Sequence, residues 1–142
     1  MNERICRLPD AKATQALGSE LGKTLPAGSV LLLTGDLGSG KTTLVQGLAL
    51  GLEIQDAIVS PTFTIINEYL GARLPLYHLD LYRLNATEVD ELYLESYWLG
   101  LENELGIVAI EWAERLSNLP SDYIRIELTY DPAEGRIAKI FS

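Results

Sequence analysis

Residues 35–42, GDLGSGKT, have the residue types and the spacing of a phosphate-binding loop. They follow an apolar run at 30–34 and precede a helix predicted over 41–50. Glycines let successive backbone N–H groups point toward a phosphate, and the helix N-terminus adds positive potential. Lys41 can reach the β- and γ-phosphates, and the Thr42 hydroxyl can ligate Mg²⁺. The nucleotide-binding residues predicted from this loop are Asp36, Leu37, Gly38, Ser39, Gly40, Lys41, Thr42 and Thr43.

A phosphate-binding loop alone binds nucleotide. Hydrolysis of the nucleotide also needs groups that complete the metal shell and position a water molecule, and two carboxylates elsewhere in the chain are candidates for these roles. Asp80 lies in the alternating segment 77–82, where His78 shares its strand face. Glu111 directly follows the apolar run 107–110, at the strand end where open α/β sheets place groups that face a ligand. Either acid could instead be an edge residue facing solvent. For His78 we favour a structural hydrogen bond over proton transfer.

Three further positions have both a functional and a structural interpretation. The hydroxyls of the segment 60–62, Ser-Pro-Thr, are placed to sense a γ-phosphate through Mg²⁺, unless the proline only starts a strand. Arg136 could clamp a phosphate or stack on a base, or be an exposed arginine at a strand start. Trp112 adjoins Glu111 and could report on the site, although core packing is the usual role of a tryptophan.

The elements that must position these residues alternate between strand and helix patterns. Strands are predicted at 4–8, 30–34, 62–69, 74–81 (with a turn at Gly71), 107–110, 123–130 and 136–141. Helices are predicted from an Asp10 cap to Gly22 or Gly28, over 41–50, and from Asn85 or Thr87 to Tyr97, with a helical turn at 112–116. This order predicts an α/β fold over residues 1–142: a single P-loop NTPase-like domain with a mixed, mostly parallel sheet and helices on both faces.

Composition limits the class of protein. A net charge of −9, from 20 acidic against 11 basic residues, opposes tight independent binding to nucleic acid. The sequence shows no signal-like start and no apolar run near the roughly 18 residues of a membrane span. Its single cysteine cannot form an intramolecular disulfide. We therefore expect a soluble, unsecreted cytoplasmic protein without membrane contact.

Taken together, the segments GDLGSGKTT, SPTFTIINEY, YHLDLYRL, IEW at 110–112 and EGR at 134–136 resemble the TsaE family. These are small bacterial P-loop ATPases of tRNA threonylcarbamoyladenosine biosynthesis. The loop alone is shared by many proteins, but this order of motifs is far more specific. The resemblance covers nearly the whole chain and includes Thr14.

The resemblance implies ATP and Mg²⁺ as cofactors, slow ATP hydrolysis, and association with TsaD-like and TsaB-like subunits. That assembly transfers threonylcarbamoyl to N6 of adenosine 37 in tRNAs reading codons that begin with A. This chain would drive the assembly through its ATP cycle and would not itself form the new bond to adenosine. Tight binding of tRNA by this chain is not expected. It further implies Walker roles for Lys41 and Thr42, with Lys41 catalytic and Thr42 a metal ligand. Glu111 becomes the metal-linked acid and Asp80 a catalytic acid. Thr14 and Arg136 become nucleotide neighbours.

The chain departs from the family pattern at Tyr93, which stands where a glycine is usual. A backbone that required a positive φ there would be strained by tyrosine. The loop is therefore expected to differ locally, together with any partner contact that it makes.

The residues alone leave other functions open. A small P-loop metabolite kinase would need an arginine-bearing lid, whereas the cations after the loop are scattered: Arg73, Arg83, Arg115, Arg125, Arg136 and Lys139. A GTPase switch would need a base-reading Asn-Lys-x-Asp element, which the sequence lacks. A regulatory adaptor that binds nucleotide without turnover has the same sequence signature as a slow ATPase.

Overall fold

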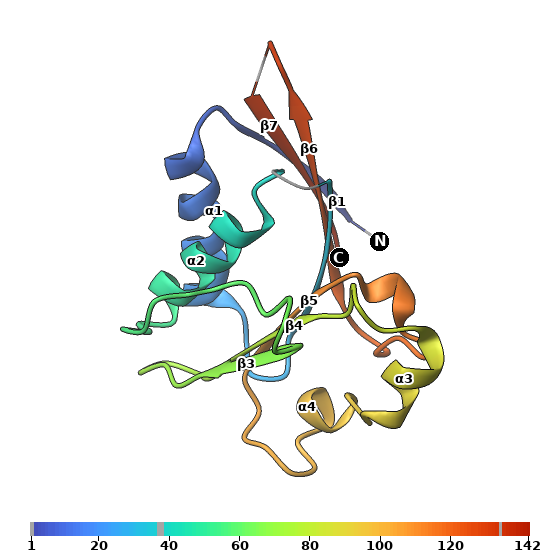
Figure 1. Cartoon of the computed structure of the whole chain (residues 1–142). Helices are drawn as coiled ribbons and strands as arrows, with labels where there is room; N and C mark the ends of the chain where they lie inside the picture. Colours follow the sequence, from blue (N-terminus) through green and yellow to red (C-terminus); the bar gives the residue numbers. More distant parts are fainter. Residues whose placement is uncertain (1, 37–38, 134) are drawn as a thin grey trace.

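The computed structural model describes residues 2–36, 39–133 and 135–142 (Figure 1). The predictions for Leu37 and Gly38, and the first residue of the EGR motif, lie outside these residues. A seven-stranded sheet runs through the described structure in the order β1-β7-β6-β2-β5-β4-β3. Its strands are β1 (Glu3–Leu8), β2 (Val30–Thr34), β3 (Ile66–Tyr69), β4 (Leu76–Asp80), β5 (Ile107–Glu111), β6 (Ile124–Asp131) and β7 (Gly135–Phe141).

The sheet is mixed, with a parallel centre. β6, β2, β5 and β4 are neighbours that all run in the same direction. β7 pairs antiparallel with β6 and β1, and β3 pairs antiparallel with β4. Because the central strands are parallel, their carboxyl ends lie at one edge of the sheet. The predicted mixed, mostly parallel α/β fold is confirmed.

Helices cover both faces of the sheet, as predicted (Figure 1). α1 (Ala11–Thr24) and α2 (Lys41–Gly51) pack on one face, and α3 (Ala86–Glu91), α4 (Ser96–Leu99) and the 3₁₀ turn η1 (Ala113–Arg115) lie on the other. In the described part of the chain, no helix has the length and apolarity needed to cross a membrane.

Helix α1 braces the helix that follows the phosphate-binding loop. A Cβ atom on Gly18 of α1 would lie 2.3 Å from the backbone oxygen of Leu44, and one on Gly47 of α2 would lie 2.3 Å from that of Gln15. Only glycine permits this approach. Gly22 lies inside α1 and packs against Gly51, and the helix ends at Thr24, between the two predicted stops at Gly22 and Gly28. The close contact fixes the position of α2, and therefore of Lys41 at its start.

The central strands divide their side chains between two cores. On β5, Ile107 and Ala109 belong to the core under α1 and α2, whereas Val108 and Ile110 belong to the core under α3 and α4. Successive strand residues point to opposite faces. Glu111 therefore points to the α2 face, and on β4 His78 and Asp80 point there too, because Tyr77 and Leu79 occupy the opposite core.

The largest differences from the predicted bounds are at the strand predicted at 62–69 and the helix predicted to reach Tyr97. The strand predicted at 62–69 begins only at Ile66, because the N–H of Ile65 donates to the carbonyl of Pro61 at 2.6 Å and closes a turn. The helix that starts at the Asn85 cap stops at Glu91, and Tyr93 adopts a φ of 50°. The left-handed conformation expected for a glycine at position 93 is thus present, and tyrosine carries its strain.

Candidate functional site

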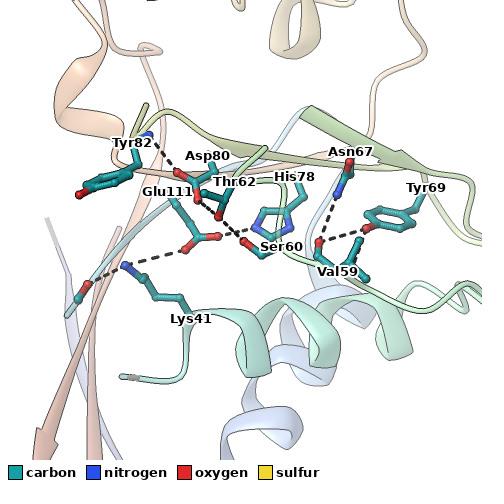
Figure 2. A network of polar contacts seen from close by, with 11 residues as sticks. Lys41, Val59, Ser60, Thr62, Asn67, Tyr69, His78, Asp80, Tyr82 and Glu111 are labelled. Atoms are coloured by element: carbon teal, nitrogen blue, oxygen red, sulfur yellow. Dashed lines mark hydrogen bonds and ion pairs between the residues drawn. The ribbon is translucent and has the colours of Figure 1, made fainter. Parts of the chain in front are cut away.

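The carboxyl ends of the parallel strands face the start of α2 at one edge of the sheet (Figure 2). β4 ends at Asp80 and β5 at Glu111, while α2 begins at Lys41. A cavity of about 340 Å³ lies between them. The residues that line it are Gly40, Lys41, Thr42, Thr43, Ser60, Thr62, Asp80, Tyr82, Glu111, Trp112 and Arg136.

The Lys41 ammonium lies between the loop and the strand ends. Its Nζ donates to the carbonyl oxygen of Gly35 at 2.7 Å and lies 3.9 Å from Oε1 of Glu111. The same nitrogen is 5.5 Å from the centre of the Trp112 ring. With the side chain only 12% exposed, these contacts hold the charge at the cavity wall, where a phosphate on the loop would meet it.

Gly40 is the N-cap of α2, and its lack of a side chain leaves space for Arg136 to lie against the loop. It has a φ of 106°, and a Cβ atom there would lie 3.2 Å from Cδ of Arg136. Since glycine has no side chain to cap the helix, the first N–H groups of α2 are left for an anion. Arg136 comes from β7, near the end of the chain, and lines the same cavity. The geometry thus places it beside the loop and at the start of β7, and its contact with a phosphate or base stays a prediction.

Asp80 and Glu111 lie side by side, because they are register partners on parallel neighbouring strands. Both are buried, with exposures of 6% and 5%. Two adjacent buried carboxylates repel, so each needs its own donors. Asp80 accepts from the Thr62 hydroxyl at 3.2 Å and from the N–H of Tyr82 at 3.0 Å. Neither acid is therefore the solvent-facing edge residue of the alternative interpretation.

Glu111 has a different set of partners. Its Oε2 lies 2.8 Å from Nε2 of His78, and its Oε1 faces Lys41. His78 is completely buried, and its contact with Glu111 agrees with the hydrogen-bonding role favoured from the sequence. What the sequence did not indicate is the partner, since the two residues are 33 positions apart.

The loop between α2 and β3 adds two hydroxyls to those that Thr42 and Thr43 of α2 bring to the cavity. The hydroxyls of Ser60 and Thr62 lie 2.7 Å apart, and that of Thr62 contacts Asp80.

Two aromatic rings also line the cavity: those of Tyr82 and Trp112, whose centres are 4.8 Å apart. The sequence interpretation missed Tyr82; its position two residues after Asp80 in the alternating segment was the available signal.

Not every predicted residue lines the cavity. Thr14 is buried in α1, where its hydroxyl donates to the carbonyl of Asp10 at 3.4 Å. The carbonyl of Asp36 accepts from the N–H of Ser39 at 3.0 Å. Ser39 is buried, and its hydroxyl has no hydrogen-bond partner among the described residues. A buried hydroxyl normally has a hydrogen-bond partner, so the hydroxyl of Ser39 fits a loop whose polar atoms bond to a bound group such as a phosphate.

The residues at the cavity fit a metal that is carried by a nucleotide. Within the described ranges, no group of three or more His, Cys, Asp or Glu side chains could hold a metal ion alone. Mg²⁺ in phosphate sites is usually held by one or two protein oxygens together with phosphate and water. Thr42 and Glu111 both line the cavity and provide such oxygens.

The parallel sheet, the glycine loop and the helix that begins at Lys41 define this chain as an α/β domain of the P-loop type. The family model described as "Threonylcarbamoyl adenosine biosynthesis protein TsaE" matches residues 8–138. The chain belongs to the TsaE family, as its motifs indicated.

Relatives and a solved structure agree with this assignment. A Nostoc protein is 61% identical over 133 residues, covering 94% of this chain and 82% of its own length. A Synechocystis protein is 58% identical over 123 residues, covering 85% and 78%. Both are named tRNA threonylcarbamoyladenosine biosynthesis protein TsaE. The crystal structure of Bacillus subtilis YdiB superposes with a TM-score of 0.80 at 33% identity, covering 98% of this chain and 84% of the other.

Proposed function

We propose that this protein binds ATP with Mg²⁺ and hydrolyses it slowly to support formation of N6-threonylcarbamoyladenosine at position 37 of tRNA. The observation that carries the proposal is the convergence of Lys41, Thr42, Asp80 and Glu111 on one cavity. These residues come from three separate elements and are the groups that phosphoryl transfer to water requires.

Lys41 and the start of α2 would hold the triphosphate. The helix N-terminus and the lysine supply positive potential at the cavity wall, which offsets the negative charge of the chain as a whole. Arg136, lying against Gly40, would add a second cation to the phosphates. The net charge of −9 therefore does not oppose nucleotide binding locally, although it does oppose tight binding to tRNA.

Thr42 and Glu111 would hold Mg²⁺, which when bound neutralises developing charge on the phosphates. Asp80 is held by Thr62 and by the backbone of Tyr82, so its carboxylate has a fixed orientation at the cavity. In hydrolysis a water oxygen bonds to the γ-phosphorus while the bond to the ADP oxygen breaks, and the water loses a proton. Asp80 would orient that water and accept its proton.

The partners would be TsaD-like and TsaB-like subunits of the transferase assembly. The chain would act on this assembly through its ATP cycle, because the modified nucleoside is formed by the partners in the scheme that the family implies. Its location in the cytoplasm, where tRNA is modified, is part of the same proposal.

The test is a pull-down from a lysate, with and without ATP and Mg²⁺, combined with phosphate release by the purified protein. We expect recovery of the two subunits and Mg²⁺-dependent turnover that Glu111→Gln lowers and the exposed control Glu91→Gln retains. Nucleotide binding without turnover, alone or with partners, would favour the adaptor. Phosphate transfer to a metabolite would favour the kinase, and no affinity for ATP would refute the proposal.

A further inference from the structure

The single histidine of the chain has a contact that the proposed chemistry does not use. We infer that His78 is a positioning residue that sets the orientation of the Glu111 carboxylate toward the metal ion. The inference rests on the proposed function, because it concerns the same acid.

The position of His78 on the sheet explains how it reaches Glu111 (Figure 2). On β5 its register partner is Ala109, a small residue that leaves room beside the imidazole on the α2 face. Glu111 lies two residues beyond Ala109 on that same face. The imidazole can therefore lean along the sheet and meet the carboxylate at 2.8 Å.

The two oxygens of Glu111 have separate surroundings. Oε2 lies 2.8 Å from Nε2 of His78, and because a carboxylate oxygen can only accept, we assign the imidazole proton to that nitrogen; Oε1 faces Lys41 at 3.9 Å. Nδ1 of His78 has no hydrogen-bond partner in the part of the chain that the structure describes. Within that part, Glu111 is thus the only polar anchor of a completely buried ring.

The separate partners of the two oxygens matter because the Lys41 ammonium cannot contact both Glu111 and a bound phosphate equally well. When the lysine turns to the nucleotide, His78 remains as the donor that keeps Glu111 from rotating beside Asp80. Oε1 is then the oxygen presented to the metal. Loss of a hydrogen bond that orients a metal-linked group typically costs about 10–100-fold in metal affinity or activity.

The first experiment measures the Mg²⁺ dependence of ATP hydrolysis and the affinity for ATP in EDTA. His78→Leu fills the buried volume without a donor, and we expect its half-saturating Mg²⁺ concentration to rise by about 10–100-fold. Affinity for ATP without the metal should change by less than about threefold. His78→Gln, whose amide can replace Nε2 as donor, should recover most of the loss.

Tyr77→Phe is the matched control, since it removes a hydroxyl from the same strand on the opposite face. It should lower stability while leaving the Mg²⁺ dependence unchanged. Equal Mg²⁺ dependence in wild type and His78→Leu would overturn the inference, as would an equal change in Tyr77→Phe. Absence of ATP binding by wild type would instead refute the proposed function.

A second measurement does not depend on activity or on a folded His78 variant. Because the chain has one histidine, imidazole labelling with ¹⁵N gives one pair of ring signals. We expect a proton on Nε2 and a shift of the Nε2 signal in Glu111→Gln. A ring protonated only on Nδ1, or a signal unchanged by Glu111→Gln, would overturn the inference.

Discussion

Replacement of Lys41 by methionine tests the phosphate-binding role most directly. Methionine keeps most of the unbranched stem of a side chain that is only 12% exposed, and it removes the charge. The variant thus loses the contacts of Nζ with Gly35 and Glu111 but leaves the cavity filled. His78 still donates to Glu111, so the buried carboxylate is not left without a donor.

The expected loss follows from the contacts of the charged group. A charge-assisted hydrogen bond contributes about 1.5–3 kcal/mol, which corresponds to roughly a 10- to 150-fold weaker affinity for MgATP. Stability should change less than binding, because among the described residues Nζ donates to one carbonyl, that of Gly35. We expect a fall of about 1 kcal/mol in the free energy of unfolding.

Isothermal titration calorimetry with MgATP measures the affinity, and urea unfolding measures the stability. Lys23→Met, in the last turn of α1, is the matched control and should bind like wild type. Wild-type affinity in Lys41→Met would refute the reasoning. A loss of affinity matched by the control would assign the effect to net charge instead of to the loop.

Three other predictions concern the fold that carries the site. Gly47→Ala should lower the free energy of unfolding in urea by about 1–3 kcal/mol, because its Cβ would lie 2.3 Å from the backbone oxygen of Gln15; wild-type stability would show that the helices separate freely. Tyr93→Gly should raise the melting temperature slightly, since glycine adopts the φ of 50° without strain and the exposed tyrosine contributes little packing; a clear decrease would show that the ring is needed. Burial, helped by the hydrogen bond to Glu68, raises the pKa of the Tyr97 phenol above its usual 10.0. The folded state therefore holds this proton more tightly, and the resulting stability is present below about pH 10 and is lost as the pH rises through the raised value. Tyr97→Phe should flatten the alkaline decline in melting temperature, and an unchanged slope would contradict this.

Local signals in the sequence determined most of the elements. Asp10 and Asn85 cap the helices that follow them, as their side chains predicted, because an N-cap depends only on nearby residues. The apolar run of β2, the glycine loop and the helix at Lys41 appear in the predicted order for the same reason. The family is also a property of the sequence, since it rests on motifs and their order.

The tertiary structure decided which residues share the cavity. Asp80 and Glu111 become neighbours only through the register of β4 and β5, and His78 meets Glu111 through the same pairing. Arg136 reaches the loop because β7 folds back along β6. Contacts of this kind depend on packing between distant segments, which residue types and spacing do not specify.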